Sequence, residues 1–130
     1  KTYFGVNDML SELVKRGYLL AVCSNKPQIT TEKIVKTAFA PRLFSVVSGY
    51  ASGGALKPDK KAVTDVLDKL CVLPENAFLI GDMVTDAVAA LRAGVKFIAA
   101  QWGYGKVESL IASGATAFAA FPAEILKFIR

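Results

Sequence analysis

Short apolar runs alternate with amphipathic segments along the chain. The runs are nearly continuous, which is typical of strands that are buried on both faces of a parallel sheet. Between the runs, apolar residues recur at the spacing of a helix that covers a core with one face. The predicted strands are 18–23, 44–49, 77–80, 96–100 and 117–119, and the predicted helices are 6–16, 28–39, 60–70, 84–93, 107–112 and 122–129.

This alternation predicts a single α/β domain over residues 1–130, with a mostly parallel sheet and right-handed crossovers. Gly17 is expected to stop the first helix, and Asp59 is expected to cap the third. Thr30 or Thr31 is expected to cap the second helix. The helical positions expected to face the core are Val6, Met9, Leu10, Leu13 and Val14 in the first helix and Ile29, Ile34, Val35 and Ala38 in the second.

The strand 77–80 is followed by Gly81 and then by two acids, Asp82 and Asp86, about one helical turn apart. In open α/β sheets, ligands bind beyond the carboxyl ends of the strands. Two carboxylates placed there have the chemistry to hold Mg²⁺, which prefers oxygen ligands. The alternative is that Asp82 caps the next helix and that Asp86 is a solvated acid favoured by the helix dipole.

Two further polar sites fall at or beyond the same edge of the expected sheet. Ser24 and Asn25 follow the first predicted strand, and Lys57 follows the loop after the second. A hydroxyl, an amide and an ammonium group can all donate to a phosphate oxygen. Taken alone, Ser24 and Asn25 would be a common turn pair and Lys57 a surface lysine. Their convergence with the two acids favours a site for a phosphate and a cation.

Composition narrows the chemistry. The formal charge of +5 suits an anionic ligand, but no basic run indicates nucleic-acid binding. The chain contains no histidine, which excludes Ser/His and Cys/His nucleophile pairs and His-ligated zinc. A cysteine phosphatase loop needs Cys-x5-Arg, and position 29, six after Cys23, is Ile. Cys23 and Cys71 are expected to be reduced core residues of a cytoplasmic protein. No apolar run reaches the length of a membrane span.

The ordered motifs Ser24-Asn25-Lys26, Lys57-Pro58-Asp59 and Gly81-Asp82-x-x-x-Asp86 resemble those of the haloacid dehalogenase superfamily, in its phosphoglycolate phosphatase-like form. The segment Trp102-Gly103-Tyr104-Gly105 adds to this resemblance, which extends over essentially the whole chain. The resemblance implies a Rossmann-like three-layer core and a Mg²⁺-dependent phosphatase that hydrolyses a small phosphomonoester.

The resemblance also implies residue roles. Ser24 would bind the transferring phosphoryl group, and Asn25 would shape the same pocket. Lys57 would steady the nucleophile and the phosphate. Asp82 and Asp86 would help to bind Mg²⁺. Many relatives carry Ser at the position of Met83, a departure that concerns only a secondary hydrogen bond.

One element of that family is missing from the sequence. The family's chemistry starts with an Asp-x-Asp motif on a first strand, and no Asp here has another Asp two residues later. The motif, its strand and a cap domain would lie upstream of Lys1, and the strand would normally sit between the strands 18–23 and 77–80. The hypothesis is therefore a partial phosphatase core that associates with the missing N-terminal part or with a second copy.

Two other classes are compatible with these residues. One is a catalytically inactive domain that binds a phosphorylated ligand or a protein partner. The other is a receiver-like regulatory domain, which fits less well because its first strand should end in an acidic cluster rather than in Ser24-Asn25. The sequence does not identify the phosphomonoester.

Overall fold

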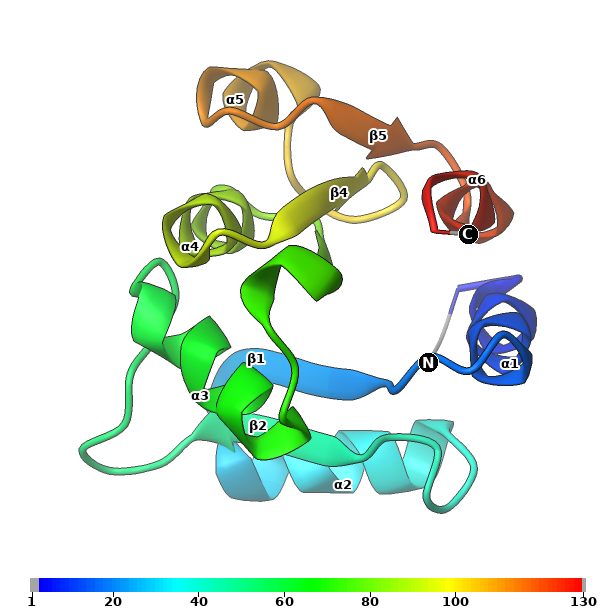
Figure 1. Cartoon of the computed structure of the whole chain (residues 1–130), viewed down its shortest axis with the longest axis vertical. Coiled ribbons are helices and arrows are strands. Elements are labelled where there is room, and N and C mark those ends of the chain that lie inside the picture. The colour runs from blue at the N-terminus through cyan, green and yellow to red at the C-terminus, as the bar shows by residue number, and fades with distance from the viewer. Residues whose placement is uncertain (1–2, 130) are drawn as a thin grey trace.

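Within residues 3–129, which the computed structural model describes, five parallel strands form the middle layer of an α/β fold (Figure 1). They are β1 (Ala21–Pro27), β2 (Val46–Tyr50), β3 (Phe78–Gly81), β4 (Lys96–Ala100) and β5 (Ala117–Ala119). The fold class expected from the sequence is confirmed.

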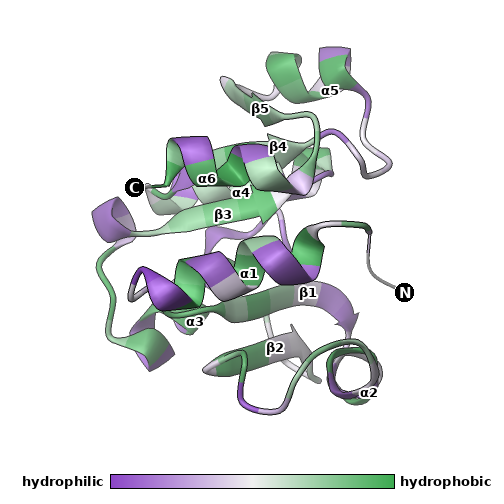
Figure 2. Ribbon diagram, turned by 90° about the vertical axis from the view of Figure 1, so that its right-hand side faces the viewer, coloured by the Kyte–Doolittle hydropathy of each residue, from purple (hydrophilic) through white to green (hydrophobic). Residues whose placement is uncertain are grey.

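The strands do not form one continuous sheet in this part of the chain. β1 pairs with β2, and β3, β4 and β5 form a separate sheet in that order. One edge of β1 and one edge of β3 therefore lack a paired strand within residues 3–129. Figure 2 shows the two strands running in the same direction, with α1 (Val6–Lys15) drawn between them and roughly parallel to both. The interruption falls where the sequence analysis expects a missing strand.

Helices cover both faces of the strands. Figure 1 shows α3 (Lys60–Leu70), α4 (Val84–Ala93) and α5 (Val107–Ala112) on one side, and α1 and α6 (Ile125–Phe128) on the other. Because consecutive strands are parallel, each connecting helix returns the chain from the carboxyl end of one strand to the amino end of the next. α2 (Gln28–Ala38) packs on β1 and β2, and two short 3₁₀ turns, η1 (Pro74–Asn76) and η2 (Pro122–Glu124), precede β3 and α6.

The apolar core has two parts, one beneath each helical layer. The part beneath α3, α4 and α5 includes three alanines of α4, and such small side chains allow a helix to pack closely against a strand. Its buried members are Val63, Leu67, Ala87, Ala89, Ala90, Val95, Phe97, Ala99, Leu110 and Ala115. The other part joins α1 and α6 to the opposite face of the strands. Its buried members are Met9, Leu10, Leu13, Leu20, Ile98, Ala119, Ile125 and Ile129. Among the described residues, no helix is long and apolar enough to cross a membrane.

The first strand lies further along the chain than predicted. β1 begins at Ala21 and continues to Pro27, so Ser24 and Asn25 belong to its last part rather than to a following loop. Its pairing with β2 is irregular between Cys23 and Pro27. The predicted strand started too early because the residues before Ala21 are apolar. Leu20 is buried, but it precedes the strand.

Two of the four positions of the second helix that were expected to face the core are exposed, whereas Val35 and Ala38 are partly buried. Ile29 is 70% exposed and Ile34 is 44% exposed, whereas Thr31 is the buried residue of α2. Its hydroxyl donates to the carbonyl of Pro27 at 3.0 Å, so it does not cap the helix. Gly49 in β2 leaves the space that this hydroxyl fills, because a Cβ at position 49 would overlap with it. Packing against β2 therefore decided the orientation of α2.

The predicted start of the third helix and the predicted end of the first helix are confirmed. Asp59 caps α3 as expected and accepts a hydrogen bond from the backbone N–H of Lys61 at 2.9 Å. Gly17 follows the end of α1 with a φ of +90°, a left-handed conformation that favours glycine.

Two predictions of burial are wrong. Val14 was expected to face the core but is 47% exposed. Cys71 is exposed rather than buried, because it lies just past the end of α3.

Candidate active site

Lys57 lies in the loop that leads from β2 to α3, and its ammonium group is enclosed. Nζ lies 2.7 Å from Oδ1 of Asp86, and it donates a 2.6 Å hydrogen bond to the carbonyl oxygen of Cys23. Only 9% of the Lys57 side chain and 11% of the Asp86 side chain are exposed. A lysine with such partners is not an ordinary solvated surface lysine. The loop delivers a fixed positive charge to the carboxyl end of β1.

Asn25 holds the backbone of Lys57. Its Nδ2 donates to the carbonyl oxygen of Lys57 at 2.9 Å, and its Oδ1 accepts from the backbone N–H of Lys57 at 2.9 Å. The two bonds join residues 32 positions apart in the sequence. Sequence reasoning placed Asn25 and Lys57 near one another but did not foresee this direct pairing.

Asp86 lies in the first turn of α4 and is almost fully buried. While Oδ1 pairs with Lys57, Oδ2 accepts from the backbone N–H of Met83 at 3.1 Å, and this bond closes the first turn of the helix. Gly81 makes room for it, since a Cβ there would lie 2.5 Å from Asp86 Oδ2. Asp86 is therefore a buried, paired acid, and the alternative of a solvated first-turn acid is wrong.

Asp82 follows β3 directly and is held by the loop after β4. Its Oδ2 accepts from the backbone N–H of Tyr104 at 2.8 Å. A Cβ at Gly103 would overlap with the Asp82 side chain, and a Cβ at Gly105 would overlap with the Asp82 backbone carbonyl. Met83, not Asp82, occupies the N-cap position of α4. In the sequence, Gly103 and Gly105 contribute only to the family resemblance, and their contact with Asp82 is not predicted, although two glycines after a buried strand are a signal for a close approach of the backbone.

Ser24 lies near the end of β1, beside Asn25. Its Oγ accepts from the backbone N–H of Lys26 at 3.0 Å. Because a hydroxyl can donate one hydrogen bond while it accepts others, the Ser24 proton stays available to a ligand oxygen. No hydrogen bond between described residues joins Ser24 to Lys57 or Asp82, so the structure places Ser24 at the same strand edge without linking it to them directly.

Cys23 is an inert neighbour of this site. Its thiol donates a weak hydrogen bond to the carbonyl of Ala62 at 3.4 Å. Burial raises the pKa of the Cys23 thiol, the nearby Lys57 ammonium lowers that pKa in part, and Asp86 adds to the increase. The net effect keeps the thiol protonated, and a protonated thiol is a poor nucleophile.

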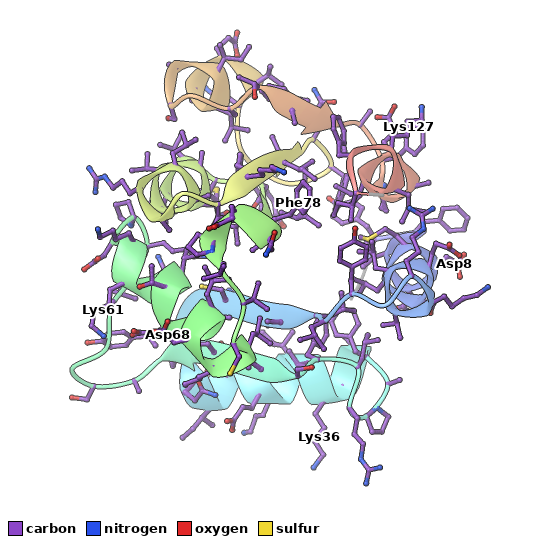
Figure 3. The ribbon with its side chains drawn as sticks, viewed as in Figure 1. Asp8, Lys36, Lys61, Asp68, Phe78 and Lys127 are labelled. Carbon is purple, nitrogen blue, oxygen red and sulfur yellow. The ribbon has the colours of Figure 1, made fainter. Side chains whose placement is uncertain are left out.

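The remaining aspartates are not placed to act as the phosphoryl acceptor. Asp59 caps α3, and Asp65 forms an exposed ion pair with Lys61 at 2.8 Å. Figure 3 shows Asp8 on the outer side of α1 and Asp68 on α3. Among residues 3–129, no ion pair joins any of these carboxylates to Lys57, which pairs with Asp86. Asp82 is held separately, by the backbone N–H of Tyr104.

The acids fit a partial site for a hard cation. No group of three or more His, Cys, Asp or Glu residues with metal-binding geometry occurs among the described residues. However, Mg²⁺ is often bound by one or two carboxylates together with waters and substrate phosphate. Asp82 has one oxygen, Oδ1, that accepts no hydrogen bond from a described residue, while both oxygens of Asp86 have partners. The donor set therefore suits Mg²⁺, with Asp82 the more accessible ligand.

Comparison with known proteins gives a consistent picture. The model of the haloacid dehalogenase-like hydrolase family matches residues 1–100. A phosphoglycolate phosphatase from Aquifex aeolicus is 35% identical over 85% of this chain and 52% of its own length. A 5'-nucleotidase from Pseudomonas aeruginosa is 28% identical over 92% of this chain and 54% of its own length.

Solved structures agree with these sequence relatives. The crystal structure of a predicted phosphoglycolate phosphatase from Haemophilus somnus superposes with a TM-score of 0.90 at 30% identity. The superposition covers all of this chain and 58% of the other. The chain spans about half the length of the curated relatives it matches.

Proposed function

The chain belongs to the haloacid dehalogenase-like hydrolase family, and we propose that it forms part of the active site of a Mg²⁺-dependent phosphatase of the phosphoglycolate phosphatase type. The observation that carries this proposal is the enclosed Lys57, held between the Cys23 carbonyl and Asp86 at the carboxyl ends of the strands. A preorganised cation at that position suits the stabilisation of a phosphoryl group in transfer.

In the proposed reaction, an aspartate carboxylate from outside this chain attacks phosphorus and the ester P–O bond breaks. The leaving oxygen takes a proton from a general acid, and water then hydrolyses the aspartyl-phosphate, releasing phosphate and restoring the carboxylate. Ser24, Asn25 and Lys57 serve the phosphate side of the site. Ser24 donates its hydroxyl proton, and the Lys57 ammonium balances charge that builds up on the phosphoryl oxygens.

Asp82 and Asp86 are the proposed Mg²⁺ ligands. The ion, when bound, would neutralise charge on the phosphoryl oxygens. Gly103, Gly105 and the Tyr104 N–H hold Asp82 in place, because they pack against its side chain and carbonyl. The substrate is a small phosphomonoester, and the relatives named as phosphoglycolate phosphatase and as 5'-nucleotidase leave its leaving group open.

A second candidate is a catalytically inactive domain that binds a phosphorylated ligand or a protein partner. It is favoured by the lack of a suitably placed nucleophile among residues 3–129, where the other aspartates are committed elsewhere. The free edges of β1 and β3 support association with the strand of another segment or of a second copy. We place the protein in the cytoplasm because Cys23 and Cys71 are both free thiols.

The test is hydrolysis of an aryl phosphate with and without Mg²⁺, measured on this chain and on a version extended upstream by an Asp-x-Asp strand and a cap. We expect turnover only in the extended version. Asp82→Ala in that version should lower Mg²⁺-dependent turnover at least about 100-fold, because the metal loses a ligand. Met83→Ser is the matched control, since Met83 contributes its backbone N–H, and its activity should stay near that of the parent.

Three results would count against the proposal. Turnover by residues 1–130 alone would mean that the nucleophile lies within the chain. Inactivity of the extended version, with phosphate binding retained, would support the inactive binding domain. Unchanged activity in Asp82→Ala would remove Asp82 from the metal site.

A further inference from the structure

The side-chain amide of Asn25 binds the backbone of Lys57 at two points, and we call this pair of hydrogen bonds the Asn25 clamp. Both the carbonyl oxygen and the N–H of Lys57 are bonded to the amide at 2.9 Å. A planar amide that donates and accepts at once fixes both the position and the orientation of the backbone that it contacts. Asn25 itself lies in the last part of β1, within the stretch between Cys23 and Pro27 where the pairing with β2 is irregular.

The other end of Lys57 is held independently. Its Nζ is bound by the Cys23 carbonyl, two residues before Asn25 in the same strand, and by Asp86 of α4. Cys23 and Asn25 therefore both contact Lys57, Cys23 through its backbone carbonyl and Asn25 through its side-chain amide. The last part of β1 therefore fixes Lys57 at its backbone and at its charged tip.

We infer that Asn25 is a positioning residue, which supports phosphate binding by holding Lys57 rather than chiefly by contacting the phosphate. This inference rests on the proposed function for its consequence, but the clamp itself is tested without catalysis. A flexible lysine loses much side-chain freedom when it is fixed, and a clamp formed in advance removes that cost from ligand binding.

The chain offers a matched control at Gln28. Its Nε2 donates to the Val47 carbonyl at 3.0 Å and its Oε1 accepts from the Gly49 N–H, which is the same two-point amide link made from α2 to β2. Gln28→Ala and Asn25→Ala each remove one such link. Only Asn25→Ala releases the backbone of Lys57. Urea unfolding of both variants establishes that each is folded under the conditions of measurement.

Two measurements separate the roles. The first is acetylation of lysines by acetic anhydride, followed by peptide mass spectrometry, with Lys61 as an internal reference because 66% of its side chain is exposed. We expect Lys57 to react faster relative to Lys61 in Asn25→Ala and at the parent rate in Gln28→Ala. The second is titration with inorganic phosphate in the presence of Mg²⁺. We expect the Kd to rise about tenfold in Asn25→Ala and to stay unchanged in Gln28→Ala.

The outcomes distinguish the clamp from its alternatives. Weaker phosphate binding with unchanged Lys57 acetylation would overturn the inference and make Asn25 a direct phosphate ligand. Equal effects in Asn25→Ala and Gln28→Ala would overturn it in favour of a general loss of stability. Failure of the parent chain to bind phosphate would count against the proposed binding site, and the acetylation rates would still decide whether Asn25 holds Lys57.

Discussion

Positions 103 and 105 accommodate only glycine without a shift of the structure, because Asp82 occupies the space in which a Cβ atom would lie. The neighbouring Tyr104 donates its backbone N–H to the acid, and Tyr104 is 90% exposed. The position of Asp82 is thus determined by backbone that lies beyond β4, more than 20 residues away in the sequence. A scan for acidic ligands alone finds Asp82 but not the loop that holds it.

Gly105→Ala should displace Asp82, because the new methyl group overlaps with the Asp82 carbonyl and backbone cannot yield as a flexible side chain can. We expect a loss of stability of about 1–3 kcal/mol and weaker Mg²⁺ binding, measured by urea unfolding and by Mg²⁺ titration. Tyr104→Ala is the control from the same loop and should bind Mg²⁺ as the parent does. Parent-like Mg²⁺ affinity in Gly105→Ala would show that the close approach is dispensable.

At the scale of elements, the buried ion pair between Lys57 and Asp86 ties α4 to the loop before α3. Asp86 also closes the first turn of α4, so one side chain serves both the helix and the site. The exposed pair of Lys61 and Asp65 on α3 has similar geometry at 2.8 Å but lies in solvent. The two ion pairs differ in burial rather than in distance, and the exposed pair contributes less to stability because water screens it.

Asp86→Ala should therefore be far more disruptive than Asp65→Ala. Removing Asp86 leaves the Lys57 ammonium without its buried counter-ion, which costs about 3–5 kcal/mol in comparable cases. Asp65→Ala should leave the unfolding midpoint almost unchanged, because both partners are solvated. The measurement is urea unfolding of the two variants. A similar midpoint in both would indicate that water reaches Lys57 once Asp86 is gone.

Much of this arrangement could be predicted from the sequence, for reasons that are local. Asp59 caps α3 and Gly17 follows α1 because both features depend on neighbouring backbone. The burial of Thr31 in α2 could not be predicted, because it depends on a fit to Gly49 in β2. The Asn25 clamp was missed for the same reason, since it joins residues that only the folded chain brings together. The metal and phosphate roles themselves stay predictions.

At the scale of the whole molecule, the strands form two separately paired groups. β4 is paired on both sides, whereas β1 and β3 each have one unpaired edge within residues 3–129. Figure 1 shows the helices of both faces extending over this interruption, and the two core clusters hold the groups together from either side. The packing of helices thus maintains a parallel arrangement that the strand ladder does not complete.

Amide hydrogen exchange should report this directly. In parallel strands, successive N–H groups point to alternate sides, so amides of β3 that point away from β4 should exchange faster than the amides of β4. An extended chain that supplies a further strand should slow exchange at the free edges of both β1 and β3. Slow exchange at these edges in residues 1–130 would mean that another segment or a second copy already pairs with them.

Lys57 stands at the junction of the two strand groups, because its ammonium group contacts the Cys23 carbonyl in β1 and Asp86 in the half of the molecule built on β3. In the proposed phosphatase, an arriving phosphate draws on the same cation that joins the two halves. The binding of the anion and the contact between the two halves are then linked equilibria of one thermodynamic cycle. By reciprocity, whatever tightens the junction alters the affinity for the anion by the same factor as the anion alters the junction.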